Sequence, residues 1–306
     1  MLDGDPQMGP NPDNVFINTP QIDNAYKSGK PLKQRVLNAH NQVIWEKLYQ
    51  YNLSETVNKT SVKAMYTQRR YTLPCAPAPS NTIEYAVEWY DVVSQWVYLT
   101  QEKERTFTPG TANYVEKITD YQYDVPSGRH TMPVAVTTTN SDDIQYVQRS
   151  KYPKEYTTTT LNDWAAYAIK DLVDANIIHE PIETVQLVKA NSSSPEQAVR
   201  GRIVKFHTFG SQRIKPREIW LLGTTTPIGS FPFSSINGSG LFTFSGNYYH
   251  YSTSDTYDMQ GNLQTYARKD DQVSSLIWGH SGLLPTAAVK NATPPETAYT
   301  SFDEDS

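Results

Sequence analysis

Alternation of apolar and polar residues, the pattern of strands with one buried face, runs through most of this chain. Val115–Asp124, Pro133–Thr139 and Ile144–Tyr152 alternate in this way, with turn-forming residues such as Asn140 to Asp143 between them. Further strands are predicted at Tyr66–Tyr71, Thr184–Ala190, Arg202–Phe209, Glu218–Gly223 and Phe242–Tyr251, and as two pieces between Ile83 and Arg105. Residues 31–51 fit either a short amphipathic helix or two strands.

One segment departs from this pattern and predicts an amphipathic helix near residues 161–178. Its apolar residues recur with a helical period, and Thr160 or Asn162 can cap the first turn. These apolar residues are Leu161, Trp164, Ala165, Ala168, Ile169, Leu172 and Val173. Strand, turn and strand repeat on both sides of the helix, so the sequence predicts a mainly β protein whose antiparallel sheet grows by adding hairpins.

The C-terminal region shows the hairpin pattern most clearly. Gly261 and Asn262 tolerate the positive φ of a tight turn, between flanking residues Tyr257 and Leu263. Asp258 precedes the turn and can accept hydrogen bonds from its backbone. A polar turn at 269–271 then leads to a second strand that ends near Trp278. These residues form a building block of a sheet and carry no evident catalytic chemistry.

The same block resembles the tyrosine-aspartate (YD) repeats of RHS proteins from the Bacteroidota. The resemblance rests on Tyr257-Asp258, Gly261-Asn262-Leu263, Trp278-Gly279 and Pro285, and a second, degenerate unit contains Tyr123-Asp124. It extends through Asn176-Ile177-Ile178 and Pro181-Ile182-Glu183 and covers roughly residues 83–300. His280 stands where the family usually has an aromatic residue, and the Asp-Pro-x-Gly-x-Arg element of the family is missing.

The resemblance implies a structural role. Hairpins of such proteins coil side by side into an RHS-like β-shell that commonly encloses a toxin, and Bacteroidota members look like substrates of the type IX secretion system. We therefore expect a scaffold, encapsulation or adhesion segment at an extracellular or outer-membrane surface, as a fragment of a larger chain. The implied partners are the rest of that chain, neighbouring shell segments and components of the outer-membrane translocon.

Composition narrows the possible partners. The 21 tyrosines among 306 residues favour strands, and the net charge of −5 without a basic stripe argues against a nucleic-acid partner. The sequence contains no run of 18 or more apolar residues, so it predicts no transmembrane helix. Cys75 is the single cysteine, so neither an internal disulfide nor a four-cysteine zinc site can form.

Candidate chemistry is sparse. The six histidines show no metal-ligand spacing, the glycines form no phosphate loop, and His179-Glu180 fits a helix-terminal role better than an acid-base pair. We therefore predict no catalytic residue, no cofactor site, no metal site and no enzymatic activity. An enzyme with a hidden carboxylate site is the third and least favoured hypothesis.

The alternative function is a carbohydrate-binding or adhesive module. Exposed aromatic side chains can form a platform for sugars, and the candidates are Trp89, Trp96, Tyr248 and Tyr249.

For the domain organisation, the composition predicts an irregular arm at 1–30, a divergent segment with a Pro-rich linker at 31–80, the β-shell segment at 81–300 and an acidic tail at 301–306.

Overall fold

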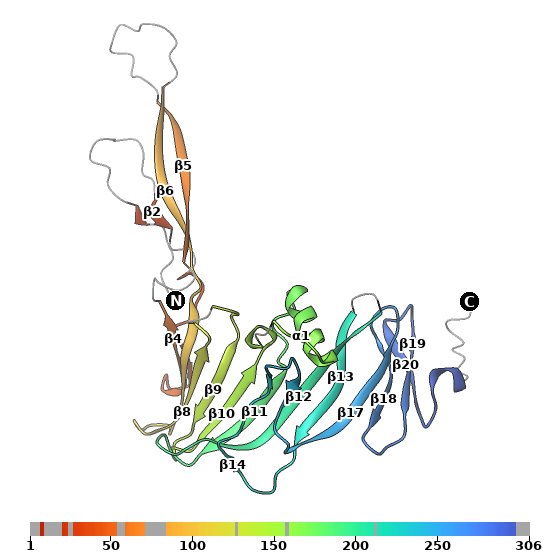
Figure 1. Cartoon of the computed structure of the whole chain (residues 1–306). Coiled ribbons are helices and arrows are strands. Elements are labelled where there is room, and N and C mark those ends of the chain that lie inside the picture. Colours follow the sequence, from red (N-terminus) through yellow and green to blue (C-terminus); the bar gives the residue numbers. More distant parts are fainter. Residues whose placement is uncertain are drawn as a thin grey trace, which may run out of the picture. The chain divides into compact units, whose positions relative to one another are not determined.

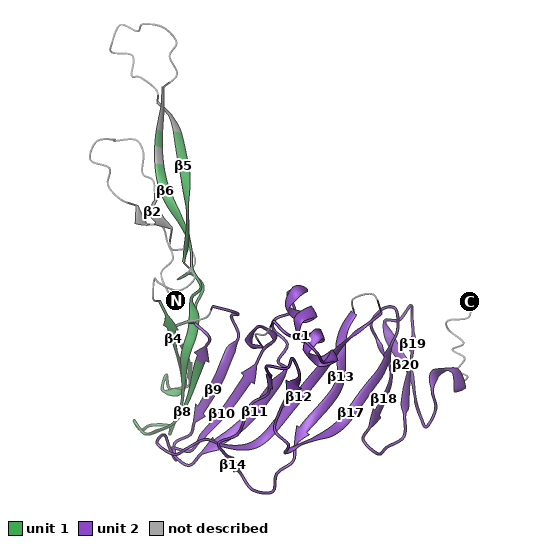
Figure 2. Cartoon of the chain, viewed as in Figure 1, with its two compact units in different colours: residues 1–121 green, residues 122–306 purple. Residues whose placement is uncertain are grey.

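The computed structural model describes residues 7–8, 20–23, 27–53, 59–70, 84–125, 128–156, 159–210 and 213–297. Cys75 and the predicted acidic tail at 301–306 lie outside these residues. The chain forms two compact units, Met1–Tyr121 and Gln122–Ser306 (Figure 2). This division falls inside the predicted 81–300 segment, whose own boundaries stay a prediction.

Unit 1 contains two antiparallel arrangements. Strands β3 (Lys33–Leu37), β4 (Val43–Asn52), β7 (Tyr98–Phe107) and β8 (Tyr114–Tyr123) lie side by side in this order. The long hairpin of β5 (Thr60–Arg70) and β6 (Glu84–Ser94) pairs Met65 with Trp89. Residues 31–51 therefore form strands, which decides the ambiguity of the sequence.

The predicted irregular arm also contains regular structure. Strand β2 (Pro20–Asp23) lies parallel to β6, and β1 (Gln7–Met8) lies antiparallel to β2. The predicted arm at 1–30 thus includes these two short strands.

Unit 2 is built on an antiparallel meander in which each strand pairs with the next (Figure 1). Its strands are β9 (Pro133–Thr139), β10 (Gln145–Lys151), β11 (Glu183–Lys189), β12 (Gln197–Phe209), β13 (Arg213–Leu222), β17 (Tyr248–Tyr257), β18 (Leu263–Arg268), β19 (Ser274–Gly279) and β20 (Leu284–Lys290). The predicted mainly β, antiparallel fold class is confirmed.

Short elements complete unit 2. Strand β14 (Ile228–Gly229) pairs with β12, and β15 (Ser235–Ile236) pairs with β16 (Phe242–Thr243). Two 3-10 turns, η2 (Pro153–Glu155) and η3 (Pro294–Glu296), follow β10 and β20. The strand predicted at Phe242–Tyr251 is wrong as a single element, because β16 ends at Thr243 and β17 begins at Tyr248.

Helix α1 (Trp164–Asp174) is shorter than the predicted 161–178. Asp163, and not Thr160 or Asn162, caps it, because the Asp163 carboxylate accepts a hydrogen bond from the Ala165 amide at 3.3 Å. At the other end Asn176 adopts a φ of 56°, and the Ile177 amide bonds the Leu172 carbonyl at 2.8 Å. This left-handed closing turn stops the helix before Ile177. Within the described residues no helix has the length and apolar character needed to cross a membrane.

The core of unit 2 lies between α1 and one face of the meander. Leu172 and Ile169 pack with Val185 and Ile203, and these four side chains are at most 3% exposed. Figure 1 shows α1 against the sheet beside β12 and β13. Burial of these apolar groups stabilises the sheet on this face, and the alternate positions of β10 and β11 point away from it.

Truncation of the helix in the core tests this packing. We expect Leu172→Ala to lower the free energy of unfolding by about 2–5 kcal/mol, because it removes a buried side chain and leaves a cavity. Tyr167→Ala on the exposed side of the same helix, where Tyr167 is 52% exposed, is the matched control. Chemical denaturation measures both, and equal losses would contradict the assigned core.

Candidate functional site

The predicted turn after β17 forms as the sequence suggests. The Asp258 carboxylate accepts hydrogen bonds from the Gln260 amide at 2.9 Å and the Asn262 amide at 2.7 Å, and Gly261 adopts a φ of 88°. Burial raises the pKa of Asp258, but the hydrogen bonds from Asn262 and its neighbours outweigh this and lower it overall. The Tyr257 hydroxyl donates to the Pro216 carbonyl at 2.5 Å, which ties the turn to β13.

Side chains of this turn also bind the next hairpin. The Asn262 side-chain amide donates to the Gly282 carbonyl at 2.7 Å, and the Trp278 indole donates to the Leu263 carbonyl at 2.7 Å. Pro285 lies opposite Trp278, and Gly279 lies opposite Leu284. The structure thus brings together the C-terminal motif residues, and the bonds of Asn262 and Trp278 join one hairpin to its neighbour. We call these contacts the hairpin links.

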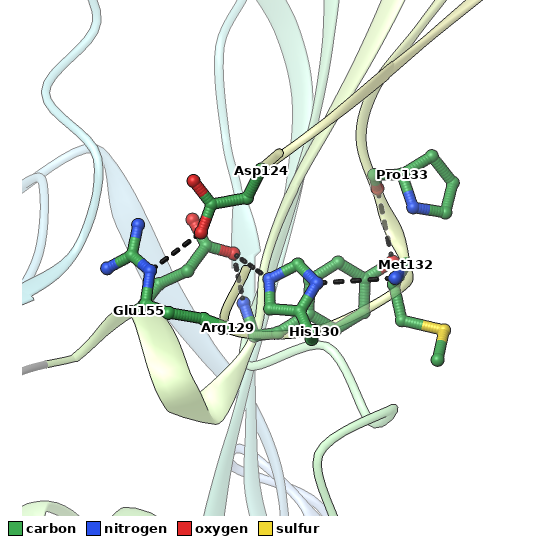
Figure 3. Close-up of polar contacts among 7 residues, drawn as sticks. Asp124, Arg129, His130, Met132, Pro133 and Glu155 are labelled. Carbon is green, nitrogen blue, oxygen red and sulfur yellow. Dashed lines mark hydrogen bonds and ion pairs between the residues drawn. The ribbon is translucent and has the colours of Figure 1, made fainter. Parts of the chain in front are cut away.

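Of the motif residues, Tyr123 ends β8 and Asp124 follows it. Figure 3 shows Asp124 next to Arg129. The Asp124 carboxylate accepts from the Arg129 guanidinium at 2.6 Å, and this bond raises the pKa of Arg129. Beside them, the buried His130 ring accepts from the Met132 amide at Nδ1, at 3.3 Å. Its Nε2 therefore carries the proton and donates to Glu155, which lies 3.2 Å away.

This cluster does not have the arrangement of an acid-base site. Glu155 also accepts from the Tyr152 amide at 2.9 Å, and the Tyr152 hydroxyl donates to the Pro133 carbonyl at 3.3 Å. The imidazole of His130 has no exposed surface. Both of its nitrogens are used inside the protein, so its role is to hold the turn before β9.

The proposed glycan platform does not assemble. Trp89 and Tyr249 are 63% and 47% exposed, but Tyr248 is only 5% exposed, so its assignment to an exposed platform is wrong. Tyr248 and Tyr249 follow each other on β17 and point to opposite faces, as neighbours on a strand must. Trp96 is half-buried and packs against Tyr98 at a ring distance of 4.5 Å.

Tyr248 instead belongs to a buried polar network that the sequence reasoning missed. Glu183, the first residue of β11, is fully buried. One carboxylate oxygen accepts from the Tyr248 hydroxyl at 2.8 Å, and the other accepts from the amide and the hydroxyl of Ser234 at 2.7 Å each. We call this the Glu183 network.

Two further groups extend the Glu183 network. The Tyr156 hydroxyl lies 2.7 Å from the Ser234 hydroxyl, and the Lys151 ammonium donates to the Ser234 carbonyl at 2.6 Å. Burial raises the pKa of Tyr156 and of Tyr248, and it lowers the pKa of Lys151. Both tyrosines therefore stay protonated and donate.

The Glu183 network has no free nucleophile or base. The Ser234 hydroxyl donates to Glu183, so it accepts from Tyr156, and Ser234 has no exposed surface. Lys151 is directed at a carbonyl and lies 4.6 Å from the centre of the Tyr156 ring. The arrangement fixes the segment around Ser234 onto β11 and β17. One signal in the sequence could have indicated this network. Glu183 follows the apolar Ile182 at the start of a predicted strand, where a side chain can face the core.

Clusters of metal-ligating side chains and the His179-Glu180 pair are the other candidates. Among the described residues, no group of three or more His, Cys, Asp or Glu side chains could hold a metal ion. His179 and Glu180 lie 3.4 Å apart, and their side chains are 61% and 50% exposed. They follow the closing turn of α1, so the expected helix-terminal role of His179 is wrong: the helix already ends at Asp174.

Comparisons with known proteins assign the chain to no family. No protein-family model matches the chain, and no curated protein matches it.

Loss of the Tyr248 hydroxyl tests the Glu183 network. We expect Tyr248→Phe to lower the free energy of unfolding by about 1.5–3 kcal/mol, because a buried carboxylate oxygen loses its donor. Tyr249→Phe changes the adjacent exposed tyrosine in the same way and serves as the control. Thermal and urea unfolding measure the difference, and a neutral Tyr248→Phe would refute the assigned hydrogen bond.

Removal of one hairpin link is the second test. Asn262→Ala deletes the bonds to Asp258 and Gly282, and we expect a loss of about 1–2 kcal/mol together with faster hydrogen exchange in β18 to β20. Gln264→Ala is the control, because it removes a side-chain amide from the adjacent strand β18 without touching the link. Equal exchange in both variants would show that the link does not join the hairpins.

Proposed function

We propose that this chain is a structural, non-catalytic segment of an RHS-like β-shell that acts in scaffolding, encapsulation or adhesion. The observation that carries the proposal is the set of hairpin links, in which the side chains of Asn262 and Trp278 bind the backbone of the neighbouring hairpin. A wall that grows by addition of hairpins needs such contacts, because each hairpin is marginally stable alone.

The polar networks support a structural role. The buried polar groups around Glu183 and His130 all bond to partners inside the protein, so they stabilise the fold and have no free capacity for a substrate. Such fully paired networks specify one arrangement of the segments that they join.

The last strand of the meander supports continuation of the wall. Among the described residues β20 pairs only with β19. The Asn291 amide bonds the Val273 carbonyl at 2.7 Å, so by alternation the Val289 amide also faces β19, and the Ala288 amide points outward. An exposed row of such groups accepts another strand.

The resemblance to YD-repeat proteins extends the proposal to location and partners. We propose an extracellular or outer-membrane surface, export through the type IX system, and neighbouring shell segments as partners. The carbohydrate-binding module with the four aromatic residues is less well supported, since Tyr248 is buried.

Edge pairing provides the test. We expect the purified chain to sediment above its single-chain mass of 34.6 kDa in a concentration-dependent way, through pairing of β20 with another strand. Ala288→Pro removes an outward donor and should restore the single-chain mass, whereas Ala288→Thr keeps the donor and should not.

Mass spectrometry of the natural protein completes the experiment. Cross-links from Lys290 to other β segments, or a longer polypeptide that contains this chain, would agree with the proposal. A natural protein of 306 residues that sediments as one chain at every concentration would refute it.

A further inference from the structure

The face of β9 to β12 that points away from α1 has its own chemistry. Val147, Val185 and Leu187 point into the core beneath the helix. Tyr146 and Gln186 occupy alternate positions of the same strands and therefore point to the opposite face. Ile169 and Leu172 of α1 pack on the core side, and α1 is the one α-helix among the described residues of unit 2, so no described α-helix covers this face.

A shallow groove of about 600 Å³ lies on this face. Its side chains include Val136, Thr138, Tyr146, Gln148, Gln186 and Arg200. The strand register places Val136, Gln148, Gln186 and Arg200 in one row across the four strands, with Thr138 and Tyr146 in the next row. A bulge in the pairing near Leu187 breaks the flat surface beside the exposed Val199.

The groove offers an exposed aromatic ring and unused polar groups. Tyr146 is 52% exposed, and Gln148, Gln186 and Arg200 are exposed as well. Within the described part of the chain these four side chains make no hydrogen bond or ion pair to another residue. Their donors and acceptors are therefore available to a ligand.

The charge of the groove is opposite to that of the whole chain. Arg200 and Arg202 project from the same face of β12, next to Gln186 and Thr184 of β11. None of the residues that line the groove is acidic, although the chain has a net charge of −5. By contrast, Arg149, which points to the other face, is neutralised by two hydrogen bonds to Glu196. The groove thus forms a local positive site.

We propose that this groove binds an acidic oligosaccharide whose sugars carry carboxylates. The Tyr146 ring stacks on the apolar face of one sugar, because tyrosine presents a large apolar surface with a polar tip. Gln148 and Gln186 bond its hydroxyls, since each amide both donates and accepts. Arg200 pairs with a carboxylate, for which the guanidinium is a two-pronged donor.

The dimensions fit a short extended chain. Arg200 lies two strands from Tyr146, roughly 10 Å across the sheet, and one residue pair along it, roughly 7 Å. Arg202 lies two residues further along β12, roughly 7 Å from Arg200 on the side away from Tyr146. One exposed aromatic and two arginines are too few for the basic stripe of a nucleic-acid site, so the saccharide is favoured. This inference does not depend on the scaffold function.

Binding of oligogalacturonate tests the proposal. We expect isothermal titration of the full chain to show binding that weakens with added salt and exceeds binding of a neutral oligosaccharide. Tyr146→Ala and Arg200→Gln should each reduce the affinity about tenfold or more, because each removes one main contact. Tyr167→Ala, an equally exposed tyrosine on α1, should leave the affinity unchanged.

The remaining outcomes overturn the proposal. All three positions are exposed, and circular dichroism and the Tm establish that each variant is folded. No binding of oligogalacturonate, or binding that both groove variants leave intact, would refute the site. Equal binding of the neutral saccharide with a silent Arg200→Gln would refute the carboxylate assignment. Tighter binding of a single-stranded oligonucleotide, lost in the same variants, would identify a nucleic-acid surface instead.

Discussion

Burial of the Glu183 carboxylate is the constraint on which unit 2 depends. A charged group without exposed surface is costly unless every lone pair has a partner. The segment between β13 and β17 provides that partner through Ser234, and β17 provides it through Tyr248. The segment after β13 is therefore a structural part of the core, because its displacement would leave the carboxylate unpaired.

This constraint explains why the two faces of the sheet differ. On one face, α1 and the segment around Ser234 cover Val185, Ile203 and the Glu183 network, whose polar groups bond to one another. Several alternate residues of β10 to β12 are exposed, and among them Tyr146 and Arg200 keep unused binding capacity. A sheet that is stabilised on one face can carry recognition on the other without loss of core packing.

Beyond the helix, the meander depends on local contacts. The hairpin links from Asn262 and Trp278 join successive hairpins. Stability in this region is a sum of neighbour contacts, which suits a wall that continues from one segment to the next. The proposed scaffold function and the proposed saccharide groove are compatible, since they use β18 to β20 and β9 to β12 respectively.

The sequence by itself determined the local structure. Period-two alternation predicted strands such as β9 and β10, and Gly261 with Asp258 predicted the C-terminal turn, because these features depend on neighbours in the chain. It did not determine the Glu183 network, since Ser234 and Tyr248 lie 51 and 65 residues from Glu183. Because burial depends on such distant partners, the sequence predicted both Tyr248 and Tyr249 to be exposed. Only the pairing of distant strands decided which ring is buried, and which of the alternate faces α1 covers.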